Sequence, residues 1–457
     1  MLRSLFALTV IAVFAFYAIG SVYAAMLMYW WFGLFRPQEW MWWDTSSLRL
    51  PLLAAALFVV PAFLKGYYPR PGKHPIGLLI VAFLVSVLIS TVDACVSDQP
   101  VDTKHIATLI LVTLISERLL NSTKDIWGLL LVATASLAYL NSHDAIDAVL
   151  GGHSLYGLLI NRGSFSDGNG AAMGGAISVF LQLFVIHTIG SGDTANTPKL
   201  LSNRPVRLAT KAALYFLLLG TVLFIFKTES RGAALSLLIG LAIWTMLQPR
   251  KLRILSTLGV LVAIVLVVGV PQSYKDRINS AFVDESELDD SAASRPHFWG
   301  IAKRMAQTHA FGVGIGCYKE NYDNYDHTGG YYGYRRSVHS SHYSIMAETG
   351  YPGFTVWVLL NLVTYVTLFK VRSRAGARRR TDPEQDFYFR LSNAIIASMT
   401  IFIIGGNFYE IAYNDYTWLM FAIAIATARL HRTAPAAAPP DRKSPASRTR
   451  ATVSNRP

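Results

Sequence analysis

The sequence is poor in charged residues and has almost no cysteine. Of its 457 residues only 15% are charged and 53% are hydrophobic, a balance that excludes a soluble domain of this length. Cysteine occurs twice, at Cys95 and Cys317, which excludes a disulfide framework and a cysteine metal site. One bridge between the two is conceivable, but we expect unpaired thiols. The sequence also lacks a P-loop, which excludes that type of nucleotide site.

Acidic residues are the scarcer of the charged types. Lysine and arginine total 41 against 28 acidic residues, which gives a net charge of +13. The basic excess lies in short segments between apolar runs, where it acts as a signal of membrane topology. A protein that binds nucleic acid would gather it on one face, so no nucleic-acid partner is expected.

Long apolar runs are abundant, and they predict a polytopic membrane protein with about twelve transmembrane helices. The first run is read as an uncleaved anchor, either one tilted helix or two helices broken at Gly20. The predicted spans are 4–34, 48–65, 76–94, 104–121, 124–141, 171–189, 210–226, 232–247, 254–270, 353–371, 391–407 and 416–430.

The basic loops predict the orientation of these spans. The clusters around Arg250, Lys370 and Arg429 all fall on one side, which is therefore expected to be cytoplasmic, with both termini. Alternation then places outside the segments 142–170, 227–231, 271–352 and 408–415. Residues 1–430 form the predicted transmembrane domain, and 431–457 a disordered, basic cytoplasmic tail.

The large external loop, 271–352, has structure of its own. Its acidic patch at 284–290 is expected to be a solvated loop rather than a cation site, so no metal is predicted. Ser294-Arg295-Pro296 starts a helix whose apolar face is expected to lie in the membrane interface. The loop's tyrosines suit either sugar rings or a membrane interface, and the sequence leaves both open: Tyr318, Tyr322, Tyr325, Tyr331, Tyr332 and Tyr334.

The end of this loop carries the strongest candidate for chemistry, His339. A histidine at a helix start is kept neutral by the helix dipole, as a proton acceptor must be. The alternative is a structural histidine bonded to a carbonyl. Gly350 is expected to stop the helix, Tyr343 shares the His339 face, and Glu348 is expected to orient another element.

Three external arginines stand near predicted helix starts: Arg162, Arg231 and Arg295. Free backbone N–H groups and guanidinium groups together suit a phosphate, so the three predict an anion site. The alternative for each arginine is a lipid headgroup contact or a carboxylate partner, such as Glu229 for Arg231.

With these motifs the chain resembles the O-antigen ligase and O-antigen polymerase superfamily. The resemblance covers about 160–360. It is carried by His339-Ser340 with Glu348, Gly350 and Gly353, by Ser230-Arg231-Gly232, by Ser294-Arg295 with Trp299, and by Gly163-Ser164-Phe165 leading to Asn169. Arg36-Pro37 after an aromatic run is similar to exosortase-associated O-glycosylation ligases.

The resemblance implies a GT-C-type glycosyltransferase of the bacterial inner membrane, with a large periplasmic loop between helices 9 and 10. It would move a glycan from undecaprenyl pyrophosphate to a lipid A core sugar at the periplasmic face, among membrane lipids and without metal or cofactor. His339 would be the base and Arg231 and Arg295 would hold the pyrophosphate, supported by Arg162, Asn169, Tyr343 and Glu348. The alternatives are an O-antigen polymerase, a protein O-oligosaccharyltransferase and, from a different class, a lipid-linked glycan transporter.

Overall fold

The computed structural model describes residues 2–41, 49–92, 95, 103–155, 165, 167–190, 196–249, 259 and 294–433. Within these residues the regular elements are all helices, which confirms the predicted helical class. The acidic patch, Arg162, the tail after residue 433 and the predicted span 254–270 apart from Gly259 lie outside the described residues.

The first half of the chain supplies helices α1 to α7. The break at Gly20, predicted as one of two alternatives, is present between the first two. Ser21 caps the second helix, because its side chain accepts a hydrogen bond from the N–H of Ala24. The helices are α1 Leu2–Gly20, α2 Val22–Phe35, α3 Leu50–Leu64, α4 Pro75–Ser90, α5 Thr103–Leu119, α6 Thr123–Leu150 and α7 Gly168–Gly190. Among the described residues, the short 3-10 helices η1 Pro37–Trp40 and η3 Pro71–Lys73 lie between them.

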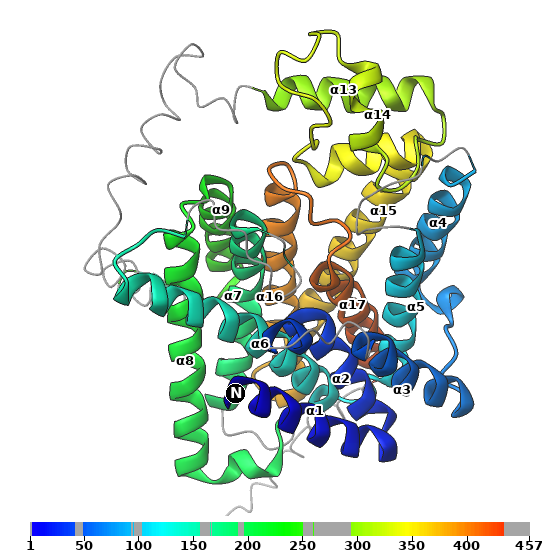
Figure 1. Ribbon diagram of the computed structural model, residues 1–457. Coiled ribbons are helices and arrows are strands. Elements are labelled where there is room, and N and C mark those ends of the chain that lie inside the picture. Colours follow the sequence, from blue (N-terminus) through cyan, green and yellow to red (C-terminus); the bar gives the residue numbers. More distant parts are fainter. Residues whose placement is uncertain are drawn as a thin grey trace, which may run out of the picture.

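The second half supplies the remaining helices of the bundle and a cap at one end. After η4 Lys199–Ser202 come α8 Arg204–Lys227, α9 Arg231–Leu247, α13 Arg295–Thr308, α14 Tyr318–Tyr325, α15 Ser341–Arg378, α16 Pro383–Gly405 and α17 Asp415–Thr433. In Figure 1, α13 and α14 lie at the top, over the first part of α15, while the other helices form the body below.

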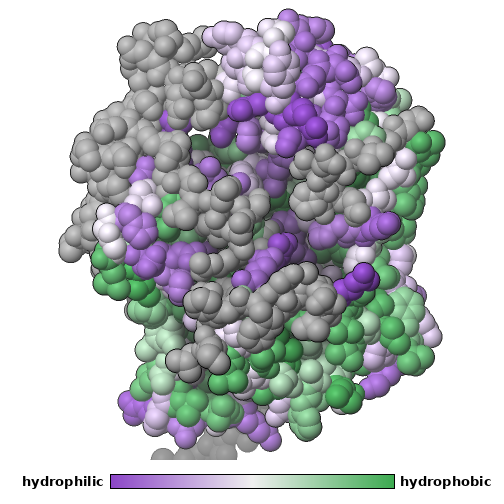
Figure 2. All heavy atoms as spheres, viewed as in Figure 1, coloured by the Kyte–Doolittle hydropathy of each residue, from purple (hydrophilic) through white to green (hydrophobic). Residues whose placement is uncertain are grey.

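Four helices of the described chain are both long and apolar enough to cross a membrane: α7, α8, α15 and α16. Shorter apolar helices accompany them, including α2, α3, α4 and α9. The total of twelve spans stays a prediction. Figure 2 shows hydrophobic surface around the lower body and hydrophilic surface over the cap, as expected if the cap stands outside the hydrocarbon layer.

The centre of the bundle is built by α7 and α16. In α7, 89% of the most apolar stretch is buried, against 33% in α8, so α7 is enclosed by protein while α8 has an open flank. The hydroxyl of Ser398 on α16 donates to the carbonyl of Ile177 on α7 at 2.7 Å. Such a bond satisfies a buried hydroxyl and fixes the two helices in register.

The cap packs on protein, so the prediction of an interfacial helix is wrong. Phe298, Ile301, Ala302 and Met305 do share one face of α13, but all four are buried in a cluster with residues of α14 and the start of α15. An amphipathic helix has the same sequence pattern whether its apolar stripe meets lipid or protein. Only the partner surface, supplied by distant residues, decides between them.

Helix α15 changes direction at Gly350, which confirms the predicted stop. Gly350 has φ 65° and ψ −176°, outside the helical region, and Pro352 follows in the first turn of the next segment. A Cβ at this position would lie 2.2 Å from the carbonyl oxygen of Ala310, so no larger residue fits without movement. The kink lets one helix both carry the end of the external loop and descend through the body.

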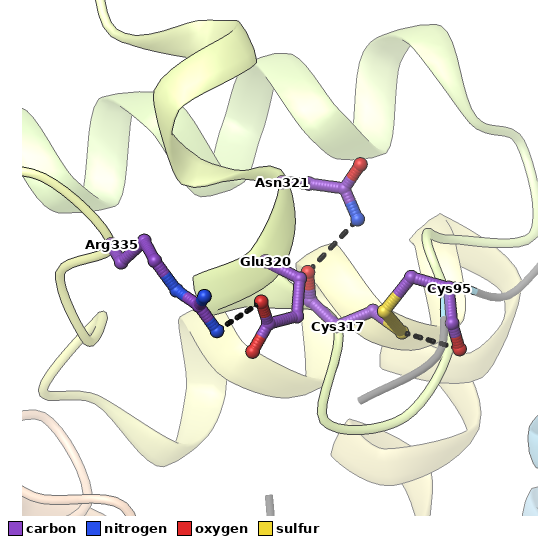
Figure 3. Close-up of a disulfide and its surroundings, with 5 residues drawn as sticks. All are labelled: Cys95, Cys317, Glu320, Asn321 and Arg335. Atoms are coloured by element: carbon purple, nitrogen blue, oxygen red, sulfur yellow. Dashed lines mark hydrogen bonds and ion pairs between the residues drawn. A yellow bond between two sulfur atoms is a disulfide. The ribbon is translucent and has the colours of Figure 1, made fainter. Parts of the chain in front are cut away.

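Cys95 and Cys317 form a disulfide, so the expectation of two unpaired thiols is wrong. Figure 3 shows the bridge beside the start of α14, joining the segment after α4 to the cap. The two residues are 222 positions apart in sequence, so spacing alone gave no indication that they meet.

Candidate functional site

His339 lies directly before α15, in a conformation that few side chains adopt. Ser340 is the N-cap of the helix, because its hydroxyl accepts the N–H of Tyr343 at 3.4 Å. His339 precedes it with φ 51°, in the left-handed region. That region costs a non-glycine residue roughly 1–2 kcal/mol, so surrounding contacts must hold it there.

Glu410 supplies one of those contacts. Its Oε1 accepts the backbone N–H of His339 at 2.9 Å, from the turn between α16 and α17. The Glu410 side chain is partly open to solvent, but the protein packed around its carboxyl desolvates it and raises its pKa to about 7. Hydrogen bonds from the backbone of His339 and Val338 act in the opposite direction.

The imidazole of His339 is neutral at pH 7. Burial lowers its pKa to about 4, and the positive charges of Arg295 and Arg336 lower it further, against the carboxylate of Asp167. The Phe298 ring lies 6.2 Å from the imidazole, and Arg336 stands over the same ring at 5.7 Å. A neutral imidazole among guanidinium groups can accept a proton while the groups around it attract an anion.

The turn at residues 406–414, between α16 and α17, fixes the start of α15. Ser341 donates its N–H to the carbonyl of Gly406 at 2.7 Å, and its hydroxyl donates to the carbonyl of Tyr409 at 2.8 Å. The same hydroxyl accepts the N–H of Ile411 at 2.8 Å. Ser340 adds a bond to the Gly406 carbonyl at 3.0 Å. The residues on both sides of the helix start are therefore held by one segment.

Phe408 of this turn lies beside Arg295 and beside the start of α9, where Arg231 is the first residue. The guanidinium of Arg295, the first residue of α13, stands over its ring at 5.7 Å from the centroid. Arg231 is the first residue of α9, and a Cβ at the adjacent Gly232 would lie 3.0 Å from the Cβ of Phe408. The starts of α9 and α13 thus meet at one aromatic ring, although 64 residues separate them in the sequence.

The start of α9 has local features of its own. Ser230 caps the helix, since its hydroxyl accepts the N–H of Ala233. Glu229 is buried with φ 56°, and its carboxylate accepts the hydroxyl of Ser154 at 2.7 Å. Ser154 lies after α6, so this contact joins two segments that were predicted to share the external side.

Asn169 lies in the first turn of α7, where its side chain is exposed. Two residues earlier, the carboxylate of Asp167 accepts the hydroxyl of Tyr409, and it also accepts the N–H of Gly170 at 3.0 Å. Asp167 therefore brings the start of α7 to the same turn that holds His339. Arg162 belongs to this region of the sequence but lies outside the described residues.

The other residues singled out in the sequence make contacts within the protein. Tyr343 stacks on Trp299 at 5.1 Å between ring centroids. Glu348 is buried, and its carboxylate accepts the hydroxyl of Tyr413 at 3.1 Å, which ties α15 to the 406–414 turn. His342 lies within 2.8 Å of the carbonyl of Ile403 through Nε2.

Sequence reasoning missed Glu410, Tyr409 and Asp167. Each lies in a segment predicted to be external. A carboxylate or phenol in such a segment could have been considered as a candidate site residue. Their relation to His339 depends on contacts across 68 to 242 positions of sequence, which no local pattern encodes.

Residues 214–358 match the family model described as O-antigen ligase. The matched segment begins inside α8 and ends inside α15, so it contains Arg231, Arg295 and His339. This match confirms the resemblance seen in the sequence. No curated protein matches the chain with significance.

Proposed function

Because residues 214–358 carry an O-antigen ligase domain, we propose that this membrane protein transfers a glycan from undecaprenyl pyrophosphate to a sugar of the lipid A core. The single observation that carries the proposal is the surroundings of His339, a neutral imidazole near Arg295 inside the matched segment. Family membership alone supports a glycosyltransferase of the ligase or polymerase type; the substrates named here are the finer part of the proposal.

In the proposed reaction, His339 takes the proton of an acceptor hydroxyl while that oxygen attacks the anomeric carbon of the donor sugar. The new glycosidic bond forms as the bond from that carbon to the pyrophosphate oxygen breaks. The electron pair leaves with the lipid pyrophosphate. Attack opposite to the leaving group inverts the configuration at the anomeric carbon. General base assistance of this kind contributes about 10² to 10⁴ in rate.

Arg231 and Arg295 stabilise the charge that develops on the leaving pyrophosphate. The Arg295 guanidinium stands over Phe408, and Gly232 at the start of α9 approaches the same residue, which supports one site served by both arginines. Charge-assisted hydrogen bonds to phosphate are each worth roughly 1.5–3 kcal/mol. Stabilisation is largest where the donors are already in place before the charge appears.

The location of the reaction is proposed to be the periplasmic face of the inner membrane. The Cys95–Cys317 disulfide supports this location, because structural disulfides persist in oxidising compartments such as the periplasm. The bridge lies in the cap with α13 and α14, at the end of the molecule that carries His339. Both termini are proposed to be cytoplasmic.

The test is transfer by the purified protein in lipid nanodiscs, with lipid-linked glycan as donor. His339→Ala should abolish detectable transfer and leave the thermal unfolding curve unchanged. His309→Ala is a matched control, since His309 lies in the same cap and bonds to Tyr325. Wild-type turnover by His339→Ala would remove this residue from the mechanism.

The acceptor decides among the functions that share this chemistry. Lipid A core, a second lipid-linked glycan and a peptide should be offered separately. Transfer to the core supports the ligase, transfer to the lipid-linked glycan supports a polymerase, and transfer to the peptide supports a protein O-oligosaccharyltransferase. Movement of the lipid-linked glycan across the bilayer without any transfer would support a transporter.

A further inference from the structure

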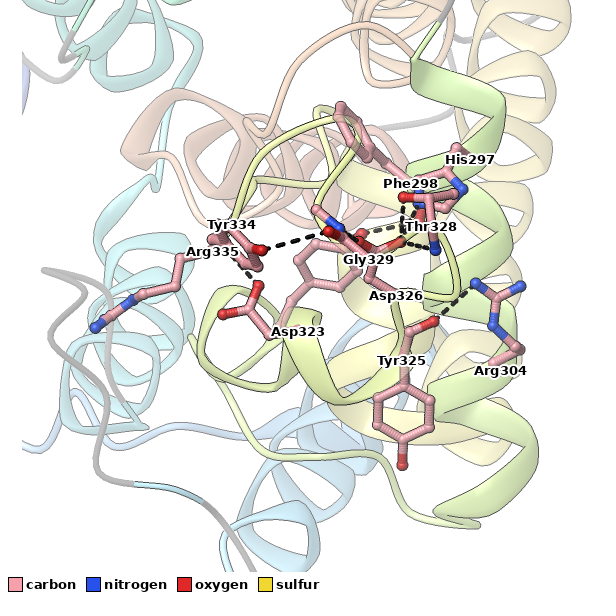
Figure 4. Close-up of polar contacts among 12 residues, drawn as sticks. His297, Phe298, Arg304, Asp323, Tyr325, Asp326, Thr328, Gly329, Tyr334 and Arg335 are labelled. Atoms are coloured by element: carbon pink, nitrogen blue, oxygen red, sulfur yellow. Dashed lines mark hydrogen bonds and ion pairs between the residues drawn. The ribbon is translucent and has the colours of Figure 1, made fainter.

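The segment at residues 326–336 joins the cap helices to the strained residue His339, and its first half is held by one carboxylate. Asp326 accepts the N–H and hydroxyl of Thr328 at 2.8 and 2.7 Å, and the N–H of Gly330 at 2.8 Å. Its Oδ1 also lies 3.0 Å from Nε2 of His297 on α13. Figure 4 shows these groups converging on Asp326.

The charge of Asp326 matches this role. Burial acts to raise the pKa of its carboxyl, but the hydrogen bonds from Thr328 and Gly330, with His297 nearby, outweigh burial and lower the pKa to about 2. Asp326 is therefore a carboxylate throughout the physiological pH range, and the turn that it holds is present before any ligand arrives.

The second half of the segment is held equally well. The N–H of Arg335 donates to Asp323 Oδ1 at 2.9 Å, and its guanidinium pairs with Glu320 at 2.5 Å. The hydroxyl of Tyr334 donates to the carbonyl of Gly329 at 3.3 Å, across the turn (Figure 4). Gly330 has φ 87°, which a side chain at that position would disfavour. The segment is thus fixed at both ends and across its middle.

This rigid segment presents two aromatic rings to solvent. Tyr331 is 81% exposed and Tyr334 is 70% exposed, the highest values among the exposed aromatic residues of the cap. They lie in the cap, whose surface is hydrophilic in Figure 2, away from the hydrophobic surface of the body. A membrane-interface role would place such rings at the edge of the apolar belt. Their position favours a water-borne ligand with an apolar face.

One of the exposed rings, Tyr331, is connected to His339 through aromatic contacts. Tyr331 meets Tyr332 edge-on at 4.9 Å between centroids, Tyr332 meets Phe298 at 6.2 Å, and Phe298 meets His339 at 6.2 Å. Only two rings therefore stand between the outermost tyrosine and the imidazole. These three steps bound the distance from Tyr331 to His339, so a ligand a few sugar units long that is held at His339 can reach Tyr331.

We propose that Tyr331 and Tyr334 form a glycan-binding subsite, where each ring stacks against the C–H face of a pyranose of the transferred or accepting chain. Tyrosine suits this role because its ring offers apolar area with little conformational entropy to lose, and its hydroxyl can bond to water or sugar. The proposal rests on the proposed function for the identity of the ligand. In this proposal the two tyrosines help to select the glycan, at a distance from the bond that reacts.

Binding without turnover is the direct test. The probes are two oligosaccharides from the host strain: the core released from lipopolysaccharide by mild acid, and the glycan released from the lipid-linked donor. Isothermal titration of the protein in nanodiscs should show binding of one of them. Tyr331→Ala and Tyr334→Ala should each weaken that binding about 2- to 10-fold, as expected for a lost aromatic contact. Tyr331→Phe, which keeps the ring, should bind within about twofold of wild type.

The kinetic readout separates binding from chemistry. In the transfer assay, the two alanine variants should raise the KM of the same substrate and change kcat less than twofold. Tyr68→Ala is the matched control, because Tyr68 is 51% exposed and lies between α3 and α4, outside the cap. The oligosaccharide that loses affinity tells whether the donor or the acceptor chain occupies the rings.

Three outcomes would decide the matter. If the wild type binds an oligosaccharide and the alanine variants bind it equally well, the subsite is wrong. If binding falls in these variants but the wild type transfers nothing, the subsite stands and the proposed function fails. If the alanine variants instead lose affinity for phosphatidylglycerol vesicles with unchanged glycan binding, the rings are membrane contacts and the subsite is wrong.

Discussion

The carboxylate of Glu410 accepts the backbone N–H of His339 at 2.9 Å, across 71 positions of sequence. The bond holds His339 in the left-handed region, where its φ is 51°. It links a group on the turn between α16 and α17 to the residue on which the proposed chemistry depends. An acidic side chain thus acts here on the backbone conformation of a histidine.

The first prediction separates the charge of Glu410 from its hydrogen bond. Glu410→Ala removes the acceptor, so kcat should fall about 10- to 100-fold, as expected for a bond to a charged group worth roughly 1.5–3 kcal/mol. Glu410→Gln keeps an acceptor oxygen and should retain most of the rate. Steady-state kcat at pH 7 in the transfer assay, compared with the wild type, measures both variants.

Glu39→Gln is the control for this pair, since Glu39 pairs with Arg36 outside the cap. The role assigned to Glu410 would be abandoned if the alanine variant turned over like the wild type. Equal loss in the alanine and glutamine variants would instead assign the effect to the charge.

The second prediction concerns acid pH. His339 must be neutral to accept a proton, and its pKa is lowered to about 4, so the neutral form persists as pH falls from 7 to about 4. The acid limb of kcat/KM should therefore lie near pH 4. Burial is the main cause of this lowering, and the charge of Arg295 adds to it. Arg295→Gln removes that charge, so the limb should move to higher pH.

The rate of Arg295→Gln will also fall at every pH, because Arg295 is placed in the pyrophosphate site. The position of the limb, rather than the rate, is the readout. Lys303→Gln removes a charge from the same helix and should leave the limb in place. An acid limb near the ordinary histidine pKa of 6.5 in the wild type would contradict the prediction.

The third prediction tests how phosphate is recognised. Lysine at position 231 or 295 keeps the positive charge but loses the two-pronged geometry of guanidinium. Arg231→Lys and Arg295→Lys should therefore be partly active, with kcat reduced more than KM is raised. Steady-state kinetics with lipid-linked donor measures both. Full activity in both variants would argue against paired hydrogen bonds to the pyrophosphate.

The fourth prediction concerns the disulfide. Replacing both Cys95 and Cys317 by serine should lower the free energy of unfolding by about 2–5 kcal/mol, the usual effect of removing a native bridge. Thermal unfolding in detergent should show a lower Tm for this double variant. Adding reductant should lower the Tm of the wild type toward the same value and leave the double variant unchanged. Coincident curves under all conditions would show that the bridge adds no stability.

The fifth prediction concerns the kink in α15. Gly350→Ala places a side chain in a left-handed conformation and within 2.2 Å of the Ala310 carbonyl oxygen. Unfolding free energy should fall by about 1–3 kcal/mol or more, and transfer should fall with it, because the kink positions the start of α15. Gly72→Ala is the control, since a Cβ there meets nothing within 4 Å. A stable, active Gly350→Ala variant would contradict the role of the kink.

The sequence was informative wherever the determinant is local. Ser294-Arg295-Pro296 marks the start of α13 and Gly350 marks the stop in α15, because proline and glycine restrict the backbone at those very positions. Ser340 caps α15 by a local bond from the N–H of Tyr343, whereas its bond to the Gly406 carbonyl depends on a residue 66 positions away. The apolar runs predict most of the described helices for the same local reason.

Features that depend on distant partners were not predictable in the same way. The apolar face of α13 fits lipid and protein equally well until Tyr318, Tyr322 and Val338 are placed against it. Glu410 carries no motif, and its importance comes from the position of His339. The bridge between Cys95 and Cys317 requires that the end of α4 and the start of α14 lie together, which no spacing rule states.

Because the chain is synthesised from its N-terminus, the sequence separation of the two cysteines affects when the bridge can form. Cys317 is translated 222 residues after Cys95, a delay of about 10 to 45 seconds at usual elongation rates. During that interval the earlier thiol has no native mate, and any oxidant on its side of the membrane can couple it to a foreign thiol. The native pairing of Cys95 therefore cannot begin until Cys317 has been synthesised, however stable the finished fold is.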